Sequence, residues 1–197
     1  MLSIKEYIQT IYRVLRFPDE TFKSNQLNLY QITSYLILSA WLYSIIANYL
    51  KSLAPFVILI LSPLSVIPHV LLTALVLYLV FNYLYNCNIK FSKCYNDVSY
   101  IFIALLPFMA IEFYQYFTEW PTIMIKTIPF LYLIILLYQF IKTNFEGIKL
   151  HKRLQALILC SLLIMFTSTI VFSINMGILV IIYEVVIGQN YVWRTNY

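Results

Sequence analysis

Glycine is scarce in this chain, with only three among 197 residues. A glycine-rich phosphate loop and a nucleophile elbow both need several glycines at fixed spacing, so these motifs are excluded. The sequence also lacks a paired zinc motif and an intramembrane aspartate dyad. It therefore gives almost no basis for an enzyme, and we expect no catalytic residue, no cofactor and no metal site.

Cysteine is equally rare. Cys87, Cys94 and Cys160 are too few for a disulfide framework, and Cys87 and Cys94 do not form a close zinc-type pair. We expect all three to be apolar fillers. Residues 1–16 also lack the continuous apolar core of a signal peptide, so we expect the spans themselves to anchor the protein.

Charge is low as well. Only 11% of the residues are charged and 62% are apolar or aromatic, whereas a soluble domain has about 25% charged residues. Such a chain cannot hide its apolar surface in water, and about 20 residues per span allow four to six crossings. We predict an all-α, polytopic transmembrane helix bundle with about five spans.

Five apolar runs carry this prediction. Residues 53–85 contain Pro55, Pro63 and Pro68, and we interpret them as a broken lead-in followed by the second run from about Ile67 to Tyr85. If residues 54–67 crossed as well, the chain would have six spans. The expected spans are 30–50, 67–85, 98–117, 122–141 and 155–183.

The last apolar run, residues 154–183, is longer than a bilayer requires, so we expect it to tilt, to kink near Gly177 or to overhang. It also carries a polar thread suited to hydrogen bonds between helices, for which simple bundle packing is the plainer explanation. The thread comprises Ser161, Thr167, Ser168, Thr169, Ser173 and Asn175.

The N-terminal region, residues 1–29, differs from the bundle of residues 30–197. Ile4, Ile8, Ile11 and Leu15 recur at helical spacing between charged residues, which predicts an amphipathic helix over residues 2–16 that lies on the membrane surface. Pro18 ends this pattern, and a polar linker leads to the first span.

The distribution of lysine and arginine predicts the orientation, because these residues collect on the cytoplasmic side of a membrane. With five spans and a cytoplasmic N-terminus, the outer side holds only Lys51, Lys126 and Arg194. The C-terminus is then external or luminal. The ten inner residues are Lys5, Arg13, Arg16, Lys23, Lys90, Lys93, Lys142, Lys149, Lys152 and Arg153.

Ionisable groups within a bilayer are costly and are functional candidates. Glu112 in the third span and Glu184 at the end of the fifth lie toward the same predicted side, where they could share an ion or a proton, or simply reach the headgroups. His69 begins the second span with no second ligand at metal spacing. His151 lies in the basic loop 142–153, which favours contact with anionic lipid headgroups.

Three short motifs resemble the Yip family of Rab-interacting multi-span membrane proteins. They are Arg16-Phe17-Pro18-Asp19-Glu20-Thr21-Phe22, Leu106-Pro107 and Gly147-Ile148-Lys149-Leu150-His151. The resemblance implies five spans, a cytosolic N-terminus and no catalytic residues. The chain lacks the longer cytosolic region and Tyr-Gly-Pro-like motif of the trafficking branch, so it is similar to the short prokaryotic members, and a prokaryotic cytoplasmic membrane is favoured.

Two functions are compatible with these patterns. The first is a non-enzymatic scaffold or accessory subunit, which binds membrane lipids and other membrane-protein subunits, or forms a homo-oligomer, and does not bind nucleic acid. The alternative is a small transporter or channel that uses Glu112. The expected partner or lipid contacts are Phe17, Pro18, Lys149, His151, Lys152 and Arg153.

Overall fold

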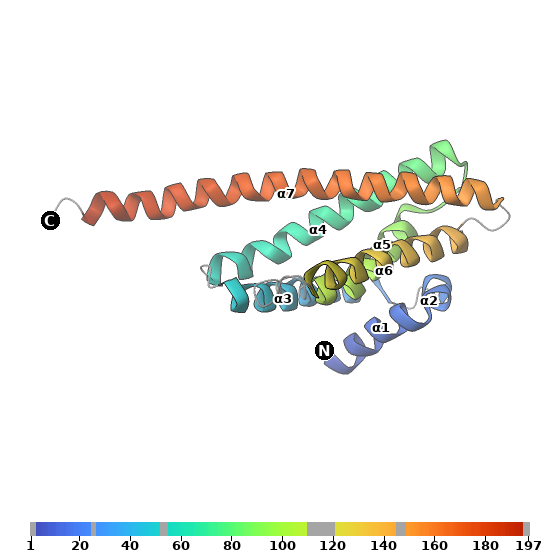
Figure 1. The fold of residues 1–197 in the computed structure, drawn as a ribbon, viewed down its shortest axis with the longest axis horizontal. Helices are drawn as coiled ribbons and strands as arrows, with labels where there is room; N and C mark the ends of the chain where they lie inside the picture. The colour runs from blue at the N-terminus through green and yellow to red at the C-terminus, as the bar shows by residue number, and fades with distance from the viewer. Residues whose placement is uncertain (1–2, 25–26, 52–54, 110–120, 145–148, 195–197) are drawn as a thin grey trace.

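The computed structural model describes residues 3–24, 27–51, 55–109, 121–144 and 149–194, and over these ranges the chain contains helices and no strand (Figure 1). A π-helical turn at Val80–Leu84 continues the fourth helix. The all-α class predicted from the sequence is confirmed for these ranges. The helices are α1 (Ile4–Arg16), α2 (Pro18–Ser24), α3 (Leu29–Lys51), α4 (Pro55–Leu79), α5 (Phe91–Met109), α6 (Pro121–Asn144) and α7 (Leu150–Arg194).

The long helices α3 to α7 overlap the five apolar runs. Within the described residues, Val66–Leu84 and Leu150–Val171 are long and apolar enough to cross a membrane. Only 33% of the first window and 22% of the second is buried inside the protein. The core helix of a soluble domain would be mostly buried, so the exposure of these two apolar helices favours association with a membrane.

The proline-rich lead-in to the second run is not broken. Helix α4 begins at Pro55 and runs through Pro63 and Pro68 to Leu79, so the predicted break is wrong. Pro55 lies at the first helical position, where no backbone donor is needed. Each interior proline removes one backbone hydrogen bond, and apolar surroundings offer the rest of the backbone no partner outside the helix. The continuous helix also has no reversal that would make residues 55–67 a separate span.

Helix α7 is continuous over 45 residues and passes through Gly177 without interruption. At 1.5 Å per residue it is about 66 Å long, roughly twice the hydrocarbon thickness of a bilayer. Its first part packs against α4 and α6, and its C-terminal part extends past the other helices (Figure 1). Of the three expected ways to accommodate the long apolar run, the structure shows an extension beyond the bundle.

Helix α1 is present and amphipathic, and its rotation about its own axis leaves the first part of the predicted apolar stripe facing outward. The buried residues are Tyr7, Thr10 and Val14, whereas Ile4 and Ile8 are 70% and 59% exposed. Tyr7 determines this rotation, because its hydroxyl lies 2.8 Å from Oγ of Ser39 and its ring lies against Tyr35 at 5.6 Å between centroids. The helix runs obliquely along the outside of the bundle (Figure 1).

Helix α2 fastens the N-terminal region to the bundle through an aromatic cluster. Phe22 is fully buried and meets Phe140 of α6 edge-on at 6.2 Å between ring centroids. Phe140 also lies 5.3 Å from Phe81, which belongs to the π-helical turn after α4. The Tyr132 hydroxyl donates to the backbone oxygen of Leu15 at 2.9 Å. The N-terminal region is therefore docked on the bundle along both α1 and α2.

The segments predicted to face the cytoplasm gather at one end of the molecule. The end of α4, the start of α5, the end of α6, the start of α7 and helix α2 all lie at the right of Figure 1. Polar contacts join them, since Lys142 at the end of α6 pairs with Asp19 of α2 at 3.1 Å. The end of α3, the start of α4 and the end of α7 lie toward the opposite end (Figure 1).

Candidate functional site

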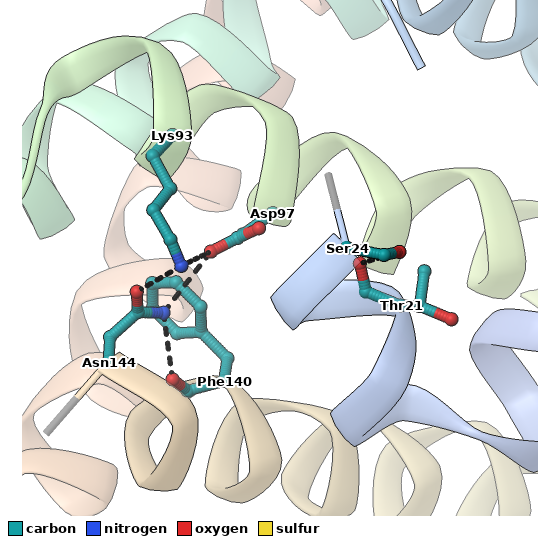
Figure 2. A network of polar contacts seen from close by, with 6 residues as sticks. All are labelled: Thr21, Ser24, Lys93, Asp97, Phe140 and Asn144. Atoms are coloured by element: carbon teal, nitrogen blue, oxygen red, sulfur yellow. Dashed lines mark hydrogen bonds and ion pairs between the residues drawn. The ribbon is translucent and has the colours of Figure 1, made fainter. Parts of the chain in front are cut away.

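A buried polar network lies where the start of α5 meets the end of α6 (Figure 2). The Lys93 ammonium donates to Oδ1 of Asn144 at 2.7 Å and lies 3.6 Å from Oδ2 of Asp97. The Asn144 side-chain nitrogen donates to the same Asp97 oxygen at 3.1 Å and to the Phe140 backbone oxygen at 2.9 Å. The amide of Asn144 thus bridges the cation and the anion.

Asp97 is the most deeply buried charged group of this network, with an exposed fraction of 0%. Burial raises the pKa of its carboxyl from 3.8 to about 6, against the opposing effects of Lys93 and of the Asn144 hydrogen bond. Its Oδ1 atom is buried and accepts no hydrogen bond from the described residues. In the sequence this residue falls just before the predicted third span, 98–117, and the network is not apparent there, although the i, i+4 spacing of Lys93 and Asp97 is a signal for such a pair.

The loop before α5 is held by a side-chain clamp. The Asn82 amide nitrogen donates to the Ile89 oxygen at 3.0 Å, and its oxygen accepts from the Ile89 backbone nitrogen at 2.9 Å. Two loop residues, Asn86 and Asn88, have φ values of 52° and 22°. Asparagine tolerates this region better than other side chains with a Cβ. Asparagines therefore determine the conformation of this loop, two through their backbone angles and Asn82 through its hydrogen bonds.

Two cavities open near this end of the bundle. The larger, of about 690 Å³, lies between α1 and α2 and is lined by side chains of both charges, including Arg13 and Glu20. The smaller, of about 480 Å³, lies between the clamped loop and the end of α6. Its charged lining residues in the described chain are Lys90 and Lys93. The two cavities therefore differ in electrostatic character.

The predicted contact residues lie at this same end. Phe17 is 43% exposed, with the Arg16 guanidinium 5.4 Å from its ring centroid, and Pro18 begins α2 and is half-buried. Around the start of α7, the exposed residues are Lys149, His151 and Lys152, and Arg153 is half-buried. Gly147 and Ile148 of the third resemblance motif lie outside the described residues. The structure thus brings both predicted contact segments to one end of the bundle.

The two predicted glutamates fall outside the described side chains. Glu112 lies outside the described residues, and Glu184 belongs to α7 without a described side chain. His69 contacts Oγ of Ser168 at 3.0 Å and the ring of Phe102. The described residues hold no group of three or more His, Cys, Asp or Glu suited to a metal.

The polar thread of α7 divides into two faces. Oγ1 of Thr167 lies 3.3 Å from Oγ1 of Thr73, which with the His69–Ser168 contact joins α7 to α4, as the interhelical prediction required. Thr169 and Ser173 are exposed, and their hydroxyls donate to backbone oxygens of α7 itself. Ser161 is half-buried, and the side chain of Asn175 is not described.

The cysteines behave as small apolar groups. Cys94 and Cys160 are buried, Cys87 is half-buried, and all three are free. Burial raises the pKa of the Cys94 thiol, which keeps it neutral and unreactive. Its thiol donates to the Ala74 backbone oxygen at 3.3 Å. These cysteines contribute packing between helices.

Comparison with known proteins gives no relative: no family model, no curated protein sequence and no solved structure matches this chain.

Proposed function

We propose that this chain is a five-span integral membrane protein of the Yip-like kind that acts as a non-enzymatic scaffold or accessory subunit. Its cytoplasmic end binds protein partners or lipids. The observation that supports the proposal most directly is the gathering of the basic connecting segments at one end of a bundle whose apolar helices face outward. Positive side chains on one membrane face suit anionic lipids and acidic protein surfaces.

The contact surface in this proposal combines α2 with the start of α7. Phe17 supplies an exposed aromatic ring, and Lys149 and Lys152 supply exposed cations. The Asp19–Lys142 pair helps to join α2 to the end of α6, just before the basic loop. A partner that met α2 would bury the Phe17 ring beside the Arg16 guanidinium, a combination that is common at protein interfaces.

Helix α1 extends this surface along the bundle. Its exposed side chains include Ile4, Ile8 and Tyr12, next to Lys5 and Arg16. An apolar strip bordered by cations is typical of a helix at a membrane interface. Tyr7 of α1 contacts Ser39, which lies about 15 Å along α3 from the start of that helix, counted at 1.5 Å per residue. The depth of α1 relative to the membrane thus depends on where α3 crosses it. The crossing of α3 is therefore the most informative point of the topology to test.

Cysteine labelling tests the topology. In a Cys87→Ser background, where the two remaining cysteines are buried, we expect Lys51→Cys to react with a membrane-impermeant maleimide from the outer side only. His151→Cys should react only after the inner side is opened. Labelling of both positions from the same side would contradict the odd number of crossings between them.

Purification in mild detergent from the native membrane, followed by mass spectrometry and particle sizing, tests the scaffold function. We expect other membrane-protein subunits to copurify with the wild-type chain. Replacing Lys149, Lys152 and Arg153 together by Gln should reduce their yield, whereas Lys90→Gln removes an exposed charge outside this surface and serves as a control. A lone wild-type monomer without lipid preference would contradict the proposal and lead to a flux assay of Glu112→Gln.

A further inference from the structure

We propose that the cavity between the start of α5 and the end of α6 binds a phosphate group. It has a volume of about 480 Å³, which exceeds the size of a phosphate and leaves room for part of the molecule that carries it. Its polar lining includes Asn88, Lys90, Lys93, Thr143 and Asn144.

The described charged residues that line this cavity are all positive. Lys90 and Lys93 are cations, and no described acidic side chain lines this cavity. Asp97 is fully buried behind Lys93 and is not part of the lining. The larger cavity between α1 and α2 is lined by both Arg13 and Glu20, so it lacks this preference for an anion. Of the two cavities, the smaller one has the single-sign lining that an anion site needs.

Lys93 is positioned for a ligand and still has a donor to offer. Its ammonium has three hydrogens, and its partners among the described residues are Asn144 at 2.7 Å and Asp97 at 3.6 Å. Its side chain remains 34% exposed. The two partners fix the direction of the side chain, so that binding an anion with the remaining hydrogen requires little further ordering.

The other wall of the cavity is also fixed in advance. The double hydrogen bond of Asn82 to Ile89 holds the loop that carries Asn88 and Lys90. The loop follows the π-helical turn at Val80–Leu84, a type of irregularity that is often found at functional sites. The first turn of the 19-residue helix α5 lies at the cavity and adds the partial positive charge of a helix N-terminus. Side chains, loop and helix thus favour the same ligand charge.

A phosphate could reach this cavity from two sources, an anionic lipid headgroup or a soluble phosphate compound. The lipid source rests on the proposed function, because that topology puts the end of α6 at the cytoplasmic surface of the membrane. The soluble source depends only on the cavity. Binding is therefore measured first in detergent, without a bilayer.

Isothermal titration of the detergent-solubilised full chain with inorganic phosphate at low salt tests the site. We expect saturable binding that Lys90→Gln weakens by about fivefold or more, as for loss of a charge-assisted contact, and that Lys90→Arg retains. Lys149→Gln removes the same charge at the same end but outside the cavity, and should change the affinity less than about twofold. Circular dichroism and thermal unfolding of each variant check its fold.

The absence of saturable phosphate binding by the wild-type chain would overturn the site, as would an equal loss in Lys149→Gln and Lys90→Gln. The source is then distinguished in nanodiscs of phosphatidylcholine with or without phosphatidylglycerol. Competition of phosphatidylglycerol with phosphate in the wild-type chain identifies a lipid headgroup, and undiminished phosphate binding identifies a soluble compound. Because Lys90 is not part of the proposed partner surface, copurification of partners with Lys90→Gln separates failure of this site from failure of the scaffold function.

Discussion

The Lys142 ammonium donates to a carboxylate oxygen of Asp19 at 3.1 Å and so joins two residues that are 123 positions apart in the chain. Both side chains remain partly exposed, at 46% and 41%. Exposed ion pairs contribute about 0 to 1 kcal/mol, because water and salt screen them. We expect Asp19→Asn to lower the free energy of unfolding by less than about 1 kcal/mol in a denaturant titration in detergent, and a larger loss would mean that the pair does more than a surface contact.

The aromatic cluster should contribute more than the ion pair to docking of the N-terminal region. Phe22 is fully buried against Phe140, so Phe22→Ala leaves a cavity and should cost about 3 to 5 kcal/mol. The same substitution at the exposed Phe17 is the matched control and should cost far less. Thermal unfolding in detergent compares the two variants. Equal midpoints would contradict the packing described for α2.

The buried carboxyl of Asp97 gives stability a defined pH dependence. Its pKa is raised from 3.8 to about 6 in the folded chain, so between these values the folded state holds the proton more tightly than the unfolded state. The free energy of unfolding should therefore fall as pH rises from about 4 to about 6, by roughly 3 kcal/mol from this group. Above this window the loss from this group is complete.

Asp97→Asn should remove this fall and leave the chain at pH 7 at least as stable as the wild type. Asp19→Asn, at a partly exposed carboxyl, should retain the fall and serves as the control. Denaturant unfolding at a series of pH values measures both variants. A strong destabilisation of Asp97→Asn at neutral pH would mean that the Lys93 and Asn144 contacts outweigh the cost of burying the charge.

The Asn82 clamp should control local opening of the loop before α5. Asn82→Ala removes both hydrogen bonds to Ile89, whereas Asn82→Asp keeps an acceptor for the Ile89 backbone nitrogen and loses the donor to its oxygen. We expect hydrogen exchange of the Ile89 amide to be fastest in Asn82→Ala and intermediate in Asn82→Asp. Unchanged exchange in both variants would contradict the clamp.

The hydroxyl contact between Thr73 and Thr167 should couple α4 to α7 weakly. Thr73→Val and Thr167→Val each remove one of the two hydroxyls, which lie 3.3 Å apart, with little change in shape. Hydrogen bonds between helices in membranes contribute about 0.6 kcal/mol on average, so a double-mutant cycle should give a coupling of this size. Unfolding in bicelles measures it, and a coupling of zero would show that the two hydroxyls act independently.

The sequence predicts one helix at each of its five apolar runs, and α3 to α7 overlap these runs, although α4 and α5 start earlier and α7 ends later than predicted. It predicts their continuity less well. The general rule that proline interrupts a helix predicts breaks at Pro63 and Pro68, yet α4 continues through both residues. In α1, the contacts of Tyr7 with Ser39 and Tyr35 decide which face of the helix is buried, and these contacts depend on how α1 packs against α3.

The candidate site is harder to predict for a related reason. Asp97 and Asn144 are 47 positions apart, and their contact depends on how α5 packs against α6. The polar composition of the segment before the predicted third span gives no sign of a helix, although this segment forms the first turns of α5. The Lys93–Asp97 spacing marks a helical ion pair but does not reveal its burial. The basic segments were easier to identify, since their charge is visible without the fold.

The docking of the N-terminal region also imposes an order on biosynthesis. Helices α1 and α2 leave the ribosome first, but their partners Tyr132, Phe140 and Lys142 are synthesised last among the residues they contact. At about 5 to 20 residues per second, the 123 positions between Asp19 and Lys142 take roughly 6 to 25 seconds to translate. During this interval Phe22 has no native aromatic partner on α6. A nascent chain arrested before α6 should therefore leave Phe22 open to chaperones or proteases, and protection should begin once α6 has emerged.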